Sequence, residues 1–344
     1  MLYATTRNSA DAYTAQRVLQ DRRASDGGFY VPFRLPVLGE EEIASFREKS
    51  FNKSVAEILN LLFNTHLTSF DLDLSVGRNS VRLEMLNTRL IMAECWHNPQ
   101  WEFRRFVKDL VGFVRQEADT AFESGDWSEI GVRIAVIFGI FSELMRRDLA
   151  ASDKKVDISV VAGDFSAPMS AWYARAMGLP VGNIICSCNE NGNLWNFICH
   201  GQLRTDGISV PTCVPEADIV IPAGIERLIC ACGGHEEVQR YLEAVRQGKT
   251  YYAEDKFLQK LRQGIYVTVT SQQRILETIP NAYTTHDYIL SPSAALNYIG
   301  LQDYRARTGE CRNALILTEK SPRIDAALVS QILGFSQQIL EKLL

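Results

Sequence analysis

From about residue 86 to its end, the chain alternates short apolar segments with longer amphipathic ones. Buried strands are expected in the apolar runs at 90–94, 156–161 and 183–187, with one more just before the change, at 81–85. Helices are expected where apolar residues recur at three- and four-residue spacing, at 102–116, 130–149, 169–177, 193–199, 226–232, 236–246 and 323–344. Strands separated by helices pair in parallel, and both faces of such a sheet are covered. The expected fold class is therefore α/β, with a mostly parallel sheet flanked by helices.

The first 85 residues have a different pattern. Helical spacing at 12–22, 40–48 and 54–64 is combined with a tight turn at 26–28 (Asp-Gly-Gly) that leads into one short strand. We therefore expect two domains, an N-terminal α+β domain at 1–85 and an α/β domain at 86–344.

The composition argues against several classes of partner. The net charge is -5 and no basic cluster is longer than a pair, so neither nucleic acid nor an anionic membrane surface is an expected partner. The longest apolar run, 134–141, is far shorter than the ~20 residues of a membrane-spanning helix. The first residues lack the pattern of a secretory signal, and eight cysteines in 344 residues are typical of buried thiols in a reducing compartment. We expect a cytoplasmic protein.

The cysteines also raise the question of a metal site. Cys230, Cys232 and His235 lie close together in the sequence, as do Cys186 and Cys188. Zinc sites usually have cysteines separated by about two to four residues, with a second pair elsewhere. Cys186 and Cys188 also fall in or beside an apolar strand, where a free cysteine packs as a small hydrophobic residue. We expect no metal site.

Residues 94–106, E-C-W-H-N-P-Q-W-E-F-R-R-F, resemble the segment E-L-F-H-G-P-T-L-A-F-K-D-F of threonine synthases. In that family the lysine carries pyridoxal 5′-phosphate (PLP) as a Schiff base. When the histidine (His97), proline and phenylalanine positions are aligned, Arg104 stands in place of the lysine. A Schiff base requires a neutral amine, whereas a guanidinium stays protonated and has no acceptor lone pair. The resemblance implies the large domain of a fold-type II PLP enzyme that holds no covalent PLP, and no cofactor is expected.

Two early segments carry the same resemblance outside the chemistry. Residues 25–32, S-D-G-G-F-Y-V-P, are similar to the family's S-D-G-G-L-Y-V-P, and 3–7, Y-A-T-T-R, are similar to its opening Y-x-S-T-R. They imply that 1–85 is a threonine synthase-like N-terminal domain.

A further resembling segment follows the strand expected at 156–161. The family's G-N-F-G-N loop, whose backbone N–H groups bind the PLP phosphate, is represented here by Gly163, Asp164, Phe165, Ser166 and Ala167. Ser166 replaces the second glycine, and Asp164 adds a carboxylate that would repel a phosphate. We expect Ser166 instead to cap the following helix, with Pro168 beginning it.

Two other positions are implied by the resemblance alone. Residues 188–191, C-N-E-N, fit the family's A-T-N-E-N, which implies a place for Asn189 beside the former cofactor pocket. Residues 317–322 stand where the family has L-A-T-A-H-P, whose threonine or serine contacts the PLP ring nitrogen. Thr318 could supply that hydroxyl.

One large part of the family's fold is missing. Residues 127–138 resemble the family helix N-x-I-N-W…R-I, but only about a dozen residues join it to the helix of Arg104. In the family, the corresponding stretch forms most of a small mobile domain and carries T-S-G-D-T-G, which this chain lacks. The resemblance implies a small domain largely deleted near 117–127.

An alternative alignment retains the Schiff base. Lys108 follows Arg104 by one helical turn on the same face, and an alignment anchored on Lys108-Asp109 would place a lysine at the cofactor. It requires a four-residue insertion and loses the match of the two phenylalanines.

Two functions follow. The first is a catalytically silent threonine synthase-like protein that acts as a binding or regulatory protein, with Arg104, Arg105 and His97 binding a small anionic ligand. The alternative is an active PLP-dependent lyase that converts O-phosphohomoserine to threonine using Lys108. Loss of the small domain would expose surface that it normally shields, so we expect a homodimer or a protein complex.

Overall fold

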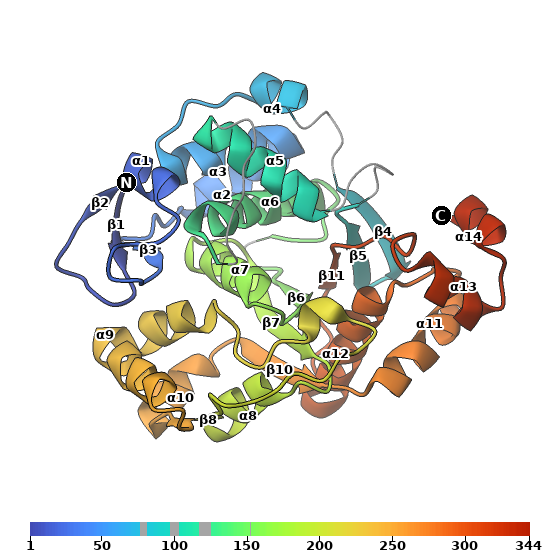
Figure 1. Cartoon of the computed structure of the whole chain (residues 1–344). Helices are drawn as coiled ribbons and strands as arrows, with labels where there is room; N and C mark the ends of the chain where they lie inside the picture. Colours follow the sequence, from blue (N-terminus) through green and yellow to red (C-terminus); the bar gives the residue numbers. More distant parts are fainter. Residues whose placement is uncertain (76–80, 97–102, 117–124, 152) are drawn as a thin grey trace.

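The computed structural model describes residues 1–75, 81–96, 103–116, 125–151 and 153–344 (Figure 1). Its centre is a sheet of six strands in the order β10-β7-β6-β11-β5-β4. The strands are β4 (Arg82–Asn87), β5 (Leu90–Glu94), β6 (Val156–Val161), β7 (Val181–Cys188), β10 (Ile265–Val269) and β11 (Ala314–Thr318). All neighbours pair in parallel except β4 and β5, which are antiparallel. The expected fold class is confirmed.

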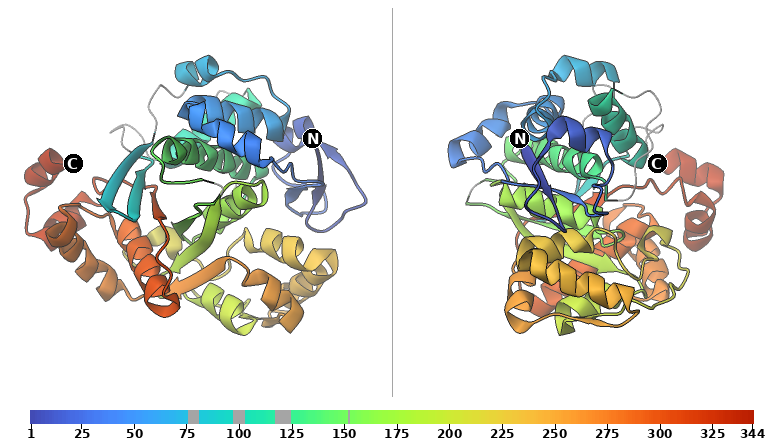
Figure 2. Two further views of the ribbon diagram at one scale, coloured as in Figure 1. Left: turned by 180° about the vertical axis from the view of Figure 1, so that it is seen from behind. Right: turned by 60° about the vertical axis from the view of Figure 1, so that its left-hand side comes forward.

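Both faces of this sheet are buried, because successive side chains of a strand point to opposite faces. In β5, Ile91 and Ala93 pack into one hydrophobic cluster, whereas Leu90 and Met92 pack into another. Helices supply the other side of each cluster (Figures 1 and 2). The first cluster includes side chains of α5 (Phe103–Arg115), α6 (Trp127–Arg146) and α7 (Ser166–Ala176), and the second includes α11 (Gln272–His286), α12 (Pro292–Thr308) and α13 (Ala326–Leu333).

The N-terminal region shares the core of the large sheet. It contains a three-stranded antiparallel sheet of β1 (Leu2–Thr5), β2 (Tyr13–Thr14) and β3 (Tyr30–Pro32), together with α1 (Ala15–Gln20), α2 (Glu40–Ser45), η1 (Phe46–Glu48), α3 (Phe51–Phe63) and α4 (Ser69–Ser75). Tyr3 and Leu59 belong to the same hydrophobic cluster as Phe138 of α6. Strand β4 runs across the expected boundary at 85/86 and is part of the large sheet, so the two regions meet within a strand.

The remaining elements follow β7. They are α8 (Asn193–His200), β8 (Gln202–Leu203), η2 (Pro215–Ala217), α9 (Ile225–Arg246), β9 (Tyr251–Tyr252), α10 (Asp255–Leu261) and α14 (Gln337–Leu343). The helices predicted at 226–232 and 236–246 are the two parts of α9, which is kinked at Gly234 with φ 78° and ψ -175°. No helix in the described part of the chain has both the length and the apolar character that crossing a membrane requires.

The prediction of one long helix at 323–344 is wrong. Gly334 has φ 69° and ends α13, and the side chain of Ser336 caps a separate helix, α14. A glycine in the left-handed region is a common helix terminus, and it outweighed the apolar spacing that continues across it.

Helices α3 and α6 pack closely because α6 has glycine at two facing positions. A methyl group at Gly139 would lie 2.7 Å from the ring of Phe51, and one at Gly131 would overlap the ring of Phe63. The two glycines, eight residues apart on one side of α6, make room for both aromatic rings.

Substituting Gly139 with alanine should therefore destabilise the fold by about 1–3 kcal/mol, because the added methyl overpacks the interface between α3 and α6. Chemical denaturation followed by circular dichroism measures the change. An increase in the free energy of unfolding, as helix propensity alone predicts for Gly→Ala, would contradict this packing.

Candidate functional site

A cleft of about 650 Å³ opens where β6 and β11 end. Because β6 and β11 are parallel neighbours, their carboxyl ends lie at one edge of the sheet, which is where open α/β sheets bind ligands. The polar residues that line it are Arg104, Glu129, Arg133, Asp164, Glu216, Ser293, Asn297, Glu319 and Lys320, and Gly163 and Ala167 lie between them.

Arg104 lies in the first turn of α5, at the wall of this cleft. Its neighbours Phe103 and Phe106 are buried, which directs the residue between them towards solvent. Arg104 has neither a hydrogen bond nor an ion pair with any residue that the structure describes. It therefore presents a charged guanidinium to the cleft.

The other expected cations lie elsewhere. Lys108 and Arg105 are exposed and are not among the described residues that line the cleft. Arg105 lies 4.0 Å from Asp109, one turn further along α5. His97 lies outside the described residues. Of the two candidates for the lysine position, only Arg104 contributes to the cleft.

A buried ion pair fixes α5 relative to α6. Arg115, near the end of α5, contacts Asp126, and the side chains of both residues are almost completely buried. Asp126 also caps α6, because its Oδ1 accepts a hydrogen bond from the backbone N–H of Ser128 at 3.0 Å. The helix of Arg104 is thus anchored at its far end.

The loop at 163–167 differs from expectation at the helix terminus. Ser166 is the first residue of α7 and does not cap it. The preceding Phe165, with φ 72°, occupies the capping position without a side-chain hydrogen bond. The carboxylate of Asp164 instead accepts a hydrogen bond from the N–H of Ser166 at 2.8 Å. A carboxylate two residues back reaches this N–H easily and is favoured by the helix dipole, so it takes the role predicted for Ser166.

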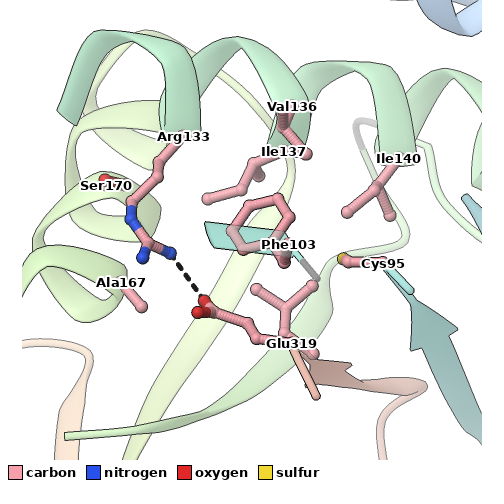
Figure 3. Close-up of a pocket in the computed structure, with 10 residues that line it drawn as sticks. Cys95, Phe103, Arg133, Val136, Ile137, Ile140, Ala167, Ser170 and Glu319 are labelled. Atoms are coloured by element: carbon pink, nitrogen blue, oxygen red, sulfur yellow. Dashed lines mark hydrogen bonds and ion pairs between the residues drawn. The ribbon is translucent and has the colours of Figure 1, made fainter. Parts of the chain in front are cut away.

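The sequence did not indicate Arg133 as a site residue. It lies on α6, where its Nε donates to Glu129 at 2.9 Å and its Nη1 donates to Glu319 at 2.6 Å. Figure 3 shows the second of these interactions. Burial would lower the pKa of Arg133, but the two carboxylates raise it above its ordinary value. Burial also raises the pKa of Glu129, and Arg133 offsets part of that effect.

A second ion pair lies in the same cleft. Lys320, just after β11, donates to Glu216 of η2 at 2.7 Å. Since η2 and β11 are about a hundred residues apart in the sequence, only the fold brings this pair together.

Two residues implied by the resemblance have structural partners. The hydroxyl of Thr318 donates to the carbonyl of Ala93 at 2.8 Å and accepts from Nε1 of Trp96 at 3.1 Å. Asn189 is completely buried, and its amide donates to Asp218 at 2.6 Å. Neither is among the described residues that line the cleft.

Among the residues that the structure describes, no cysteine belongs to a group of metal-ligating side chains. No cluster of three or more histidine, cysteine, aspartate or glutamate side chains with suitable geometry occurs among the described residues. Burial raises the pKa values of Cys230 and Cys232 to about 11. Nδ1 of His235 lies 3.0 Å from the carbonyl oxygen of Thr6.

A smaller cleft of about 260 Å³ lies beside β4 and α14. Its most buried charge is Glu94, which is 2% exposed. Oε1 accepts from the hydroxyl of Tyr288 at 2.7 Å, whereas Oε2 has no hydrogen bond and lies 3.8 Å from Arg82. Burial raises the pKa of Glu94, and Tyr288 and Arg82 offset only part of the effect.

Comparison with known proteins agrees with the resemblance found in the sequence. Residues 2–79 match the family model described as threonine synthase N terminus. The threonine synthase of Pseudomonas aeruginosa is 28% identical over 409 residues, which cover 92% of this chain and 86% of that protein. Threonine synthase-like 1 of Homo sapiens is 26% identical over 198 residues, which cover 55% of this chain and only 26% of that protein. The resemblance to threonine synthases is confirmed.

Solved structures show the same fold. The PLP-bound threonine synthase from Brucella melitensis has a TM-score of 0.85 at 18% identity, over 97% of this chain and 91% of that chain. The threonine synthase from yeast has a TM-score of 0.81 at 17% identity, over 99% and 93% of the two chains. This chain therefore shares its α/β fold with these two threonine synthases.

This chain is shorter than the sequence it resembles. The alignment with the Pseudomonas protein extends over 409 residues, more than the 344 of this chain, so it includes positions at which this chain has no residue. The expected deletion near 117–127 falls mostly outside the described residues and stays a prediction.

Substituting Glu94 with glutamine should stabilise the protein at neutral pH by about 1 kcal/mol, because it removes a poorly compensated buried charge. The folded-state pKa is raised above the unfolded value of about 4.3. The free energy of unfolding of the wild type therefore falls as Glu94 ionises, between about pH 4.3 and its folded-state pKa. The difference in free energy of unfolding between the variant and the wild type should grow over the same interval. Denaturant titrations between about pH 4 and pH 8 measure it.

Glu84→Gln is the matched control, because Glu84 pairs with the same arginine but is far more exposed. Its effect should be small at every pH. Equal gains for both variants would show that burial of Glu94 is not the cause.

Proposed function

We propose that this chain is a threonine synthase-like protein that forms no Schiff base with PLP and binds a small anionic ligand in the cleft. The observation that carries the proposal is the place of Arg104, which lines the cleft and has no acidic partner among the described residues. A permanently protonated guanidinium cannot condense with an aldehyde, and it binds carboxylates and phosphates well.

The loop at the start of α7 supports the absence of PLP. The N–H of Ser166 donates to the carboxylate of Asp164, so an internal anion is already placed where the family resemblance puts the PLP phosphate. A phosphate brought there would face this carboxylate at close range, and like charges disfavour that arrangement. The hydroxyl of Thr318 is also engaged by Trp96 and Ala93. The described residues of the cleft therefore do not fit PLP.

The charges of the cleft support an anion at Arg104. Arg133 is neutralised by Glu129 and Glu319, and Lys320 is neutralised by Glu216. Arg104 is the lining cation for which no described residue supplies a carboxylate. An incoming anion would find its strongest uncompensated attraction there.

No observation favours the active lyase that uses Lys108, since this residue is not among the described residues that line the cleft. The expected homodimer or complex stays a prediction.

The first test of the proposal is chemical. The protein is incubated with PLP, reduced with borohydride, digested and analysed by mass spectrometry, and no pyridoxyl group is expected on Lys108 or Lys320. Arg104→Lys places a primary amine in the cleft and should gain an adduct at residue 104, although a substoichiometric one, because Asp164 still repels the phosphate. Arg105→Lys, one residue further along and outside the lining residues, is the matched control and should not. A stoichiometric adduct on wild-type Lys108 would establish the alternative.

The second test measures anion binding with inorganic phosphate as the probe. Arg104→Gln should weaken phosphate binding by about tenfold or more, because a charge-assisted hydrogen bond is lost. Arg105→Gln should leave it within about twofold, since an exposed charge outside the cleft is screened by solvent. Isothermal titration calorimetry at low ionic strength gives both values. Equal affinities of the wild type and the Arg104 variant would refute the role of this residue.

A further inference from the structure

Arg133 presents an unused hydrogen-bond donor to the cleft. Its Nε and Nη1 donate to Glu129 and Glu319, but no described residue accepts a hydrogen bond from Nη2. Nη2 is not completely buried either, because the fully buried atoms without a hydrogen bond do not include it. It therefore reaches solvent. Figure 3 shows the guanidinium extending from α6 towards Glu319, with Ala167 nearby.

The two carboxylates that pair with Arg133 differ in burial and in their number of hydrogen bonds. Glu129 precedes Arg133 by one helical turn, is only 4% exposed, and accepts a second hydrogen bond from the N–H of Gly125 at 3.3 Å. The side chain of Glu319 is 33% exposed, and Arg133 is its one described hydrogen-bonding partner. Glu129 is therefore fixed, whereas Glu319 is the carboxylate that a ligand can displace into solvent, at the cost of one charge-assisted hydrogen bond.

Glu319 makes only one of the two hydrogen bonds that a carboxylate can form with a guanidinium group. Only Oε1 is within hydrogen-bonding distance, and it contacts Nη1 alone. A guanidinium edge binds an oxyanion best through two parallel N–H···O bonds, one from each terminal nitrogen. A small oxyanion that took the place of Glu319 could use both nitrogens, while the ring of Phe103, 5.0 Å away, supports the plane of the guanidinium.

We propose that Arg133 is a second anion-binding residue of the cleft, and that Glu319 is an internal anion which the ligand displaces. This inference rests on the proposed function, in which the cleft binds a small anion. Arg133 with Glu129 and Glu319 carries one positive and two negative charges. A singly charged oxyanion that replaces Glu319 leaves this balance at Arg133 unchanged, so the exchange has no large electrostatic penalty.

The ligand class is an oxyanion, and a carboxylate and a phosphate satisfy this geometry equally well. Inorganic phosphate and acetate are therefore used as separate probes. The anion that binds more tightly to the wild type identifies the preferred group.

The experiment compares Glu319→Gln with Glu216→Gln by calorimetric titration with each anion. Both substitutions remove one negative charge from the same cleft, but Glu216 pairs with Lys320 and does not contact Arg133. Glutamine at 319 keeps the size and an acceptor oxygen, so folding is expected to be retained. Glu319→Gln should bind phosphate or acetate about tenfold or more tightly than the wild type, because the internal competitor is weakened. Glu216→Gln frees the partly exposed Lys320 instead, and an ammonium group does not offer two parallel donors in a fixed geometry, so the gain should be smaller, about threefold or less.

The outcomes separate this inference from the function on which it rests. Tighter anion binding by Glu319→Gln alone supports displacement of Glu319 by the ligand. This holds even if Arg104→Gln has no effect on binding, which would refute the role proposed for Arg104. No gain for Glu319→Gln while Arg104→Gln weakens binding overturns the inference and leaves the proposed function standing. Equal gains for both glutamine variants also overturn it, since they would reflect only the overall charge of the cleft.

Discussion

The parallel pairing of β6 with β11 determines the site of this protein. Asp157 pairs with Ala314 and Ser159 with Ile316, although the two strands are more than 150 residues apart in the sequence. Their carboxyl ends consequently meet at one edge, where Gly163 and Glu319 both line the cleft. Because both faces of the sheet are buried by helices, this edge is where the fold can expose polar groups to a ligand.

Carboxylates dominate the chemistry of that edge. Glu129 and Glu319 hold Arg133, Glu216 holds Lys320, and Asp164 accepts from the first N–H of α7. Each carboxylate satisfies a donor that a bound ligand could otherwise have used. An anion that enters the cleft meets no described carboxylate at Arg104, whereas at Arg133 or Lys320 it meets a carboxylate that is already in place.

The likeness to threonine synthases extends over the fold as a whole, although most aligned residues differ. The likeness covers the N-terminal region, the sheet and its helices, with a TM-score of 0.85 to the protein from Brucella melitensis. A fold is maintained by many distributed apolar contacts, whereas a reaction depends on a few polar groups, so the fold can persist while the chemistry changes.

The sequence alone determined the class of fold, because the alternation of apolar segments specifies strands covered by helices. It also placed Arg104 between two phenylalanines, and their burial turns this residue towards the cleft. The apolar spacing of 323–344 predicted one helix, and this prediction was wrong. The positive φ of Gly334 divides the segment into two helices.

The i, i+4 pair of Glu129 and Arg133 is visible in the sequence, but its partner Glu319 is 186 residues further on. Only the tertiary structure brings that carboxylate to the guanidinium, since the contact depends on the order of strands in the sheet, and strand order is not encoded in any local pattern.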